Sequence, residues 1–163
     1  MRALTNHLSR TRFAGRLNSG VRAHMRAREL SLLQRRTLAK DRSLVQRLLG
    51  SIGGLEGNAR DLPKLQRLLV TPLAQDALIG LGTSFGDVLA SELGLSWVHF
   101  TDDLGSDHAL QAKPHQVFVF PRSMFIKRIS RGEQPATIDL AFMLAEVRKT
   151  VAEQLAGAAT SEP

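Results

Sequence analysis

Residues 78–100, LIGLGTSFGDVLASELGLSWVHF, decide the fold because the spacing of their apolar residues changes part-way along. Up to Leu93 the apolar side chains recur every three or four residues, which predicts an amphipathic helix. Gly94 then stands where helices commonly end in a left-handed residue. From Leu95 to Phe100 the run is rich in β-forming residues and follows a strand-like period. The stretch therefore predicts a helix that leads directly into a strand.

The segments that follow extend the predicted sheet. Asp102-Asp103-Leu104-Gly105 is expected to form a turn, and Val117-Phe118-Val119-Phe120, closed by Pro121, is the second predicted strand. Two strands alone make a weak sheet, so helices must cover it. The predicted fold class is therefore α+β and mostly helical, with helices packed on a small antiparallel sheet or β-hairpin and with an N-terminal basic arm.

Two further helices are predicted before this stretch. The first runs from about Arg26 to Leu49 and has a basic outer face, and the residues whose near-helical spacing defines it are Leu30, Leu33, Thr37, Leu44, Leu48 and Leu49. A short second helix begins at Asp61, whose carboxylate is expected to cap its first amides, with Pro63 tolerated in the first turn.

Two more helices are predicted after the second strand. Pro121 opens a short one that continues to Ile129. The last begins at Thr137 or Asp139, and its apolar residues are Leu140, Leu144, Val147, Val151 and Leu155. We expect one α+β domain at residues 26–157, followed by a flexible tail at 158–163.

The net charge of +7 is confined to one end of the chain. Residues 1–40 contain ten Lys or Arg and one acid, Glu29, whereas residues 41–163 contain twelve bases and fourteen acids. Within the body, residues 68–112 contain six acids and no base, and residues 113–131 contain five bases and no acid. Such segregation can orient a partner, although mixed surfaces also produce such runs by chance.

Residues 1–25 are predicted to form a basic, flexible arm with three competing interpretations. In a eukaryotic protein, an Arg-rich and acid-free leader would direct organelle import. In a bacterial protein, Met25 would be the true start and the residues before it passengers. As a nucleic-acid arm, the segment and the helix behind it would contact phosphates through Arg10, Arg12, Arg16, Arg22, Arg26, Arg28, Arg35 and Arg36.

Composition excludes several classes of protein. The chain has no cysteine, so it is neither a disulfide scaffold nor a thiolate zinc protein. No apolar run approaches the roughly 18 to 20 residues that span a bilayer. We therefore expect a bacterial cytoplasmic location, with organelle import only in a eukaryotic source, and we expect no cofactor.

A serine-hydrolase motif is present at Gly82-Thr83-Ser84-Phe85-Gly86, which matches G-x-S-x-G. Asp102 or Asp103, followed by His108 or His115, preserves the hydrolase order of Ser, Asp and His. However, a nucleophile elbow follows a strand, whereas this serine lies inside a helical pattern. We interpret the two glycines, four residues apart, as a small-residue face that permits close helix packing.

The only cluster of possible metal ligands comprises His99, Asp102, Asp103, Asp107, His108 and His115. Two histidines with carboxylates suit zinc or manganese. The cluster lacks the H-x-x-x-H helical spacing and the carboxylate spacing of a calcium loop. An acidic turn with surface histidines is the commoner arrangement, so no metal site is predicted.

Charged residues on the hairpin and on the helix after it are the candidate protein-binding residues. They are Asp102, Asp103, Asp107, Arg122, Lys127, Arg128 and Arg131. The four bases are typical of a group that grips phosphate or an acidic surface, and also of an ordinary solvated helix face. Trp97 is expected to lie in the core.

Two segments, LGTSFGDVLASELGLSWVHFTDDLG and VFVFPRSMFIKRISRGE, together resemble a family of small bacterial domains classed as a domain of unknown function. The resemblance covers about residues 61–146 and is carried by Trp97, Asp103, Gly105, Pro121, Ser123, Met124 and Arg128. It implies a bacterial source and a shared fold, but no activity.

These observations favour a non-enzymatic, small bacterial protein-binding module, for example a toxin-neutralising immunity-type or accessory protein. Its partner is expected to be a protein. The alternative is a nucleic-acid-associated protein that uses the Arg-rich arm, and a serine hydrolase is the third hypothesis.

Overall fold

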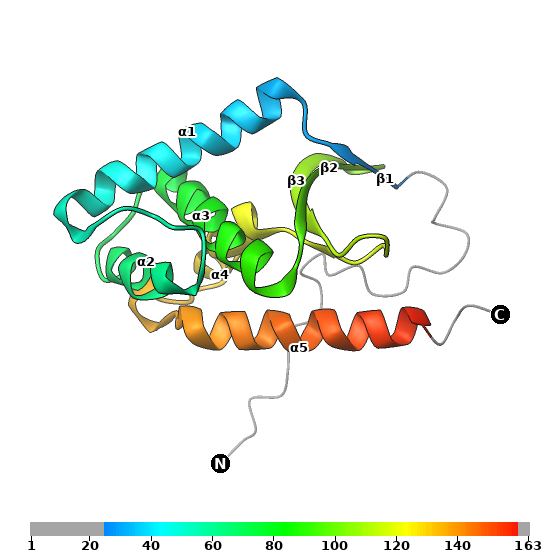
Figure 1. Cartoon of the computed structure of the whole chain (residues 1–163). Coiled ribbons are helices and arrows are strands. Elements are labelled where there is room, and N and C mark those ends of the chain that lie inside the picture. Colours follow the sequence, from blue (N-terminus) through cyan, green and yellow to red (C-terminus); the bar gives the residue numbers. More distant parts are fainter. Residues whose placement is uncertain (1–24, 160–163) are drawn as a thin grey trace, which may run out of the picture.

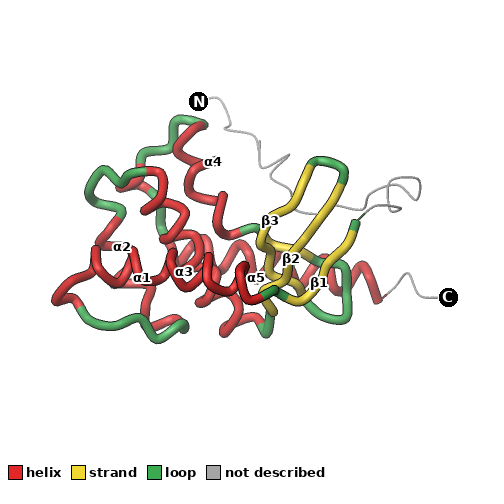
Figure 2. Tube along the Cα trace, turned by 90° about the horizontal axis from the view of Figure 1, so that it is seen from above, coloured by secondary structure: helices red, strands yellow, loops and turns green. Residues whose placement is uncertain are grey.

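The computed structural model describes residues 25–159. The elements in chain order are β1 (Arg26–Glu29), α1 (Leu32–Leu49), η2 (Gly50–Ile52), η3 (Ala59–Asp61), α2 (Leu62–Leu68), α3 (Gln75–Leu93), β2 (Ser96–Asp102), β3 (Gly105–Gln111), β4 (Phe118–Val119), η4 (Pro121–Ser123), α4 (Met124–Ser130), η5 (Pro135–Thr137) and α5 (Leu140–Ala159). Figure 1 shows α1 and α5 at opposite edges with α3 between them, and Figure 2 shows the strands grouped at one end. The predicted α+β class is confirmed.

The sheet has four antiparallel strands in the order β1-β2-β3-β4, two more than the sequence predicts. The expected turn closes a hairpin in which Ser96 pairs with Gln111 and Asp102 pairs with Gly105. Gly105 has a φ of 128°, a conformation that favours glycine over other residues. The sequence GSDHALQ of β3 begins with polar residues, so its strand pattern is weak. Pairing with β2, rather than its own alternation, makes this segment a strand.

The first predicted helix begins six residues late, because residues 26–29 form β1 instead. Ser31 and Gln34 explain the boundary. The Ser31 hydroxyl accepts from the Gln34 amide at 3.3 Å, and the Gln34 side chain accepts from the Ser31 amide at 2.8 Å. This capping box satisfies amides that the first helical turn leaves unpaired. The residues before it are free to pair with β2.

The inward face of α1 also differs from the expectation. Leu38, Val45 and Leu49 are buried, whereas Leu33 is 74% exposed and Leu48 is 44% exposed. The buried residues share the side of α1 that faces α3. The leucine pattern alone therefore gives the wrong rotation for this helix, because leucines lie on both of its sides.

The core forms around α3, as its apolar spacing predicts. Leu81, Phe85, Val88 and Leu89 are fully buried in one cluster with the apolar residues of α5, which are Leu140, Met143, Leu144, Val147 and Val151. Gly94 ends α3 with φ 65° and ψ 33°, the expected left-handed conformation. The last helix continues to Ala159, two residues beyond the predicted end, since alanines favour helix.

Asp61 precedes α2 as expected but does not cap it. Its carboxylate instead accepts from the amides of Glu56 and Gly57 and pairs with Lys64 at 3.0 Å. With 1% exposure, Asp61 holds the loop before α2 in place rather than the helix itself. No helix within residues 25–159 is long and apolar enough to cross a membrane.

Gly82 and Gly86 bring α3 into close contact with two other elements, which confirms their interpretation as a packing face. A Cβ on Gly82 would lie 2.9 Å from the Cα of Arg122 and collide with the carbonyl of Pro121. A Cβ on Gly86 would lie 2.5 Å from the Trp97 ring. Backbone and a half-buried indole packed against the core cannot move aside cheaply, so both positions require glycine.

We expect Gly82→Ala to lower the free energy of unfolding by on the order of 1 to 3 kcal/mol through overpacking. Gly157→Ala is the matched control, because it also lies in a helix but a Cβ there meets nothing within 4 Å. The control should be neutral or stabilising by up to about 1 kcal/mol. Urea unfolding of both variants measures the difference, and equal effects would contradict the close packing of α3.

Candidate functional site

Asp87 on α3 connects three elements through its carboxylate. Arg42 of α1 donates to it twice, from Nε at 2.6 Å and from Nη2 at 2.7 Å. Trp97 of β2 donates its indole N–H at 2.9 Å. The hydrogen bond to Asp87 is the main reason that the pKa of Arg42 is raised above its ordinary value. Asp87 therefore fixes where α1 and β2 lie relative to α3.

Asp41 forms a second connection one residue earlier on α1. Its carboxylate accepts from the Thr83 hydroxyl at 2.8 Å and from Arg122 Nε at 2.9 Å. Arg122 in turn lies 3.3 Å from Nδ1 of His108 on β3. Because a guanidinium only donates, this ring nitrogen must be the acceptor. Side chains from α1, α3, η4 and β3 are thus joined in one network.

The surroundings of His108 in this network lower the pKa of its imidazole. Burial lowers the pKa of His108 below its ordinary value, and the Arg122 guanidinium lowers it further. Asp107 acts in the opposite direction, but it does not reverse the shift. Arg122 and the ring of His99, whose centroid lies 6.4 Å from that of His108, flank the imidazole.

Two hollows lie along α1 and share Arg42. The first, here the Ser84 hollow, has a volume of about 520 Å³ and is lined by Arg42, Ser43, Gln46, Arg47, Leu55, Gly57, Asp61, Ser84 and Asp87. The second, here the Trp97 hollow, has a volume of about 440 Å³ and is lined by Glu29, Leu30, Arg35, Leu38, Arg42, Ser96, Trp97 and Lys113. The Arg42–Asp87–Trp97 contact stands between them.

Ser84, the serine of the hydrolase-like motif, is not on a nucleophile elbow. It lies within α3, is 2% exposed, and its hydroxyl has no hydrogen-bond partner among the described residues. A hydrolase nucleophile must be exposed after a strand and beside a base. The order of Ser, Asp and His in the sequence therefore has no counterpart in this geometry.

The predicted protein-binding acids lie on the hairpin. Asp102 ends β2, Asp103 lies in the exposed turn, and Asp107 is on β3. Arg122, predicted to belong to the same surface, is instead bonded inward to Asp41 with 19% of its side chain exposed. Its role in the fold is to connect η4 to α1.

The remaining predicted bases lie at α4. Arg128 pairs with Glu133 at 2.9 Å, Lys127 is half-buried, and Arg131 follows the end of the helix in an exposed position. Figure 2 shows α4 and the hairpin tip as separate projections. The acids of the hairpin and the bases of α4 therefore lie on different elements of the fold.

Four of the eight candidate nucleic-acid residues belong to the described part of the chain. Arg10, Arg12, Arg16 and Arg22 lie outside the described residues. Arg26 and Arg28 are exposed on β1, and Arg35 and Arg36 are exposed near the start of α1. The basic character predicted for the outer side of α1 is present.

The histidines of the possible metal cluster meet only in part. His99 and His108 are opposite each other on β2 and β3. His115 lies beyond β3, in the connection to β4. Within residues 25–159 no group of three or more His, Asp or Glu side chains is arranged to hold a metal ion.

The residues that join the elements are ones that sequence reasoning missed: Asp41, Arg42, Thr83 and Asp87. One signal was present. Asp87 is the only charged residue of α3 between Asp76 and Glu92, within an otherwise apolar run. A lone charge on such a helix must find a partner when it is buried. Nothing local indicates that this partner is Arg42.

Comparisons with known proteins agree with this fold. A match to the family model described as domain of unknown function (DUF3806) covers residues 61–140. That agrees with the kind of family predicted from the sequence. The matched residues include α2, α3, β2 to β4 and α4, and they exclude β1 and α1.

A crystal structure from Bacteroides thetaiotaomicron VPI-5482 superposes with a TM-score of 0.62 at 18% sequence identity. The superposition covers 79% of this chain and 50% of the other, so this chain spans half the length of that protein. At this identity the likeness shows the fold alone. No curated protein matches the chain.

We expect Asp87→Ala to lower the free energy of unfolding by about 1 to 3 kcal/mol, because it leaves Arg42 and the Trp97 N–H unpaired. The lower part of that range applies, since 38% of the Arg42 side chain is exposed. Glu153→Ala, an exposed acid on α5, is the control and should change stability by less than about 0.5 kcal/mol. Equal losses in urea unfolding would show that Asp87 is not a structural connection.

We expect stability to fall as the pH drops below about 6.5, the ordinary pKa of histidine. The folded pKa of His108 is lowered, so the unfolded chain binds the proton more tightly and acid favours unfolding. Urea unfolding at about pH 7.5 and about pH 5.5 should show this loss in the wild type. It should be smaller in His108→Gln and unchanged in the control His115→Gln. An identical pH dependence in all three would contradict the assignment.

Proposed function

We propose that this chain is a non-enzymatic protein-binding module that docks onto an acidic protein surface through one side of α1. That side, here the outer face, consists of Leu32, Leu33, Arg36, Lys40 and Arg47. Arg36 lies three or four residues after the two leucines, and Lys40 and Arg47 follow at intervals of four and seven, so all five side chains project from the same side of α1. An immunity-type or accessory protein would act through such a surface.

Two adjacent leucines support the proposal. Leu32 is 76% exposed and Leu33 is 74% exposed, at the beginning of the outer face. Single exposed leucines are ordinary on protein surfaces. Here the pair adjoins cationic side chains on the same helix face. Apolar residues surrounded by polar ones are the composition of a protein-binding surface.

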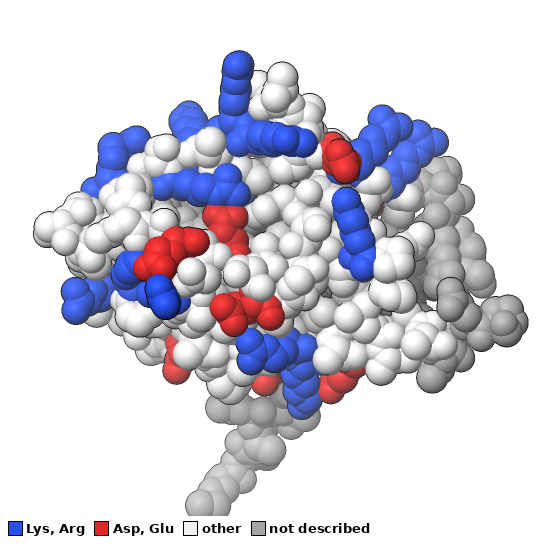
Figure 3. Space-filling view, viewed as in Figure 1, with Lys and Arg blue, Asp and Glu red and all other residues white. Residues whose placement is uncertain are grey.

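The charge of the outer face is of one sign. Arg36, Lys40 and Arg47 are exposed, and no described residue forms an ion pair with them. The one acid of α1, Asp41, points inward to Arg122. Figure 3 shows Lys and Arg gathered along the edge of the molecule that α1 forms. A complementary partner surface is therefore acidic.

The leucines also favour a protein over a nucleic acid. Phosphate contacts would use the three cations but leave Leu32 and Leu33 against solvent or sugar. A protein surface can cover leucines with its own apolar side chains and pair the surrounding cations with carboxylates. The exposed leucines, together with cations for which no described residue is an ion-pair partner, are the observation that carries the proposal.

A photo-reactive residue tests the docking face in the full chain. We expect a chain with benzoylphenylalanine in place of Leu33 to form covalent adducts in the cells that produce it. Protease should degrade these adducts, and nuclease should leave them intact. The charge reversals Arg36→Glu and Lys40→Glu should reduce adduct yield several-fold. Phe142→benzoylphenylalanine is the matched control, because Phe142 is 62% exposed on α5, away from α1.

The nature of the adducts decides between the interpretations. Adducts at position 33 that nuclease removes would replace the proposal with nucleic-acid binding. Adduct yield at position 33 no greater than at position 142, or unchanged by charge reversal, would contradict a specific α1 surface. Melting temperatures of the variants exclude misfolding as the cause of a loss.

A further inference from the structure

The Trp97 hollow lies at the junction of β1, α1 and β2. One of its walls is apolar and consists of Trp97, Leu30 and Leu38. Its charged residues are Arg35, Lys113 and Glu29, with Arg42 at the border to the Ser84 hollow. A hollow of about 440 Å³ is within the usual size range of ligand sites and accommodates one amino-acid residue with its backbone.

The polar groups at the inner end of the hollow are already paired. Asp87 accepts from both Arg42 and the Trp97 indole N–H. A ligand carboxylate therefore gains less from Arg42, whose charge Asp87 offsets, and the ligand meets the indole as an apolar surface. Trp97 is half-buried and packed against the main core, so this surface is held rigidly. Rigid aromatic walls are effective anchors because little order is lost on binding.

The cations at the edge of the hollow are not neutralised in the same way. Arg35 donates Nε to the Leu30 carbonyl at 3.1 Å, which fixes its guanidinium at the hollow while its other N–H groups have no described acceptor. Lys113 is exposed and forms no ion pair with a described residue. Glu29 is the one acid among the lining residues. The hollow therefore has a net positive charge next to an apolar wall.

We propose that the Trp97 hollow anchors a carboxylate of the protein partner, with an apolar group attached to that carboxylate packed against Trp97. Arg35 and Lys113 bind the carboxylate, and the indole and Leu30 contact the apolar group. The inference rests on the proposed function, because it specifies which part of the acidic partner is recognised. A C-terminal apolar residue has this chemistry, since its side chain and its carboxylate lie on the same residue.

The composition of the chain supplies a direct reporter. Trp97 is the only tryptophan and there is no tyrosine, so the fluorescence above the phenylalanine range comes from this hollow. The probes are N-acetyl-leucine and N-acetyl-leucinamide, which have the same apolar group and differ in whether the terminus is a carboxylate. We expect a saturable change in Trp97 emission with N-acetyl-leucine in the millimolar range, as for a small fragment, and at least a five-fold weaker response to the amide.

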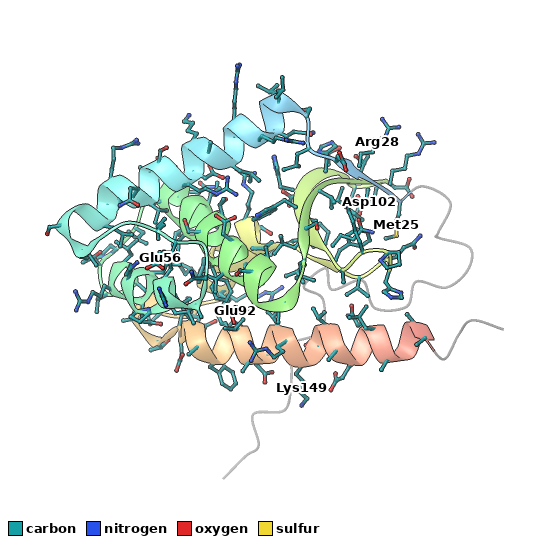
Figure 4. The ribbon with its side chains drawn as sticks, in the orientation of Figure 1. Met25, Arg28, Glu56, Glu92, Asp102 and Lys149 are labelled. Carbon is teal, nitrogen blue, oxygen red and sulfur yellow. The ribbon has the colours of Figure 1, made fainter. Side chains whose placement is uncertain are left out.

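Variants of the two cations test their roles. Arg35→Gln and Lys113→Gln should each weaken the response to N-acetyl-leucine at least three-fold and leave the response to the amide unchanged. Lys149→Gln is the control, because Lys149 projects from α5 at the opposite edge of the molecule, as Figure 4 shows. It removes the same charge without touching the hollow and should leave both responses unchanged. Thermal melting with a signal from the helices shows that each variant is folded.

Three results would overturn the inference: equal responses to the acid and the amide, no response to either, or a response that Lys149→Gln reduces as much as Arg35→Gln does. The photo-reactive chain separates this failure from that of the proposed function. Protein adducts at position 33 that persist in Lys113→Gln, together with equal fluorescence responses, would retain the docking face and reject the anchor. A carboxylate-dependent response without protein adducts would reject the protein partner and assign the hollow to a small carboxylic acid.

Discussion

The close approach of α3 to η4 and β2 is the constraint on which the other contacts depend. Gly82 and Gly86 have no side chains where the Pro121 backbone and the Trp97 ring meet the helix. At that separation Thr83 and Asp87, which alternate with the glycines, come within hydrogen-bonding reach of α1 and β2. Any larger residue at the glycine positions would move these polar groups out of range. The polar contacts of α3 therefore depend on its close packing at the two glycines.

The consequence for α1 is a division between its two sides. The inward side uses Asp41 and Arg42, both of which are bonded to other elements. Such partly buried pairs add little net stability, because desolvation offsets much of their attraction, but they define a unique geometry. The basic residues of the outward side have no such bonds within the described chain, so their charges remain free for an external partner. Thus α1 bonds to the rest of the fold on one side and forms the proposed docking face on the other.

The sequence predicts those parts of the structure that depend on local patterns. The change of apolar period at Gly94 places α3 and β2 because each element shows its own spacing. The predicted start of α1, at Arg26, is six residues early, although Ser31 and Gln34, three residues apart, carry the local signal of a capping box. The strand β3 could not be predicted from the sequence, because it begins with polar residues and becomes a strand only by pairing with β2. The Arg42–Asp87 bond joins residues 45 positions apart, so no local pattern indicates it, and the hollows beside it were equally hidden.

Because the connection between β1 and α1 is short, the sheet fixes the rotation of α1 about its own axis. Only Leu30 and Ser31 separate the two elements, and β1 pairs with β2 in a fixed register from Arg26 opposite Thr101 to Glu29 opposite Val98. If β1 slipped by one residue, α1 would have to start one residue later and turn by about 100° to keep its place. That rotation would carry Arg42 away from Asp87. Four residue pairs at the edge of the sheet therefore determine which side chains α1 directs outward along its whole length.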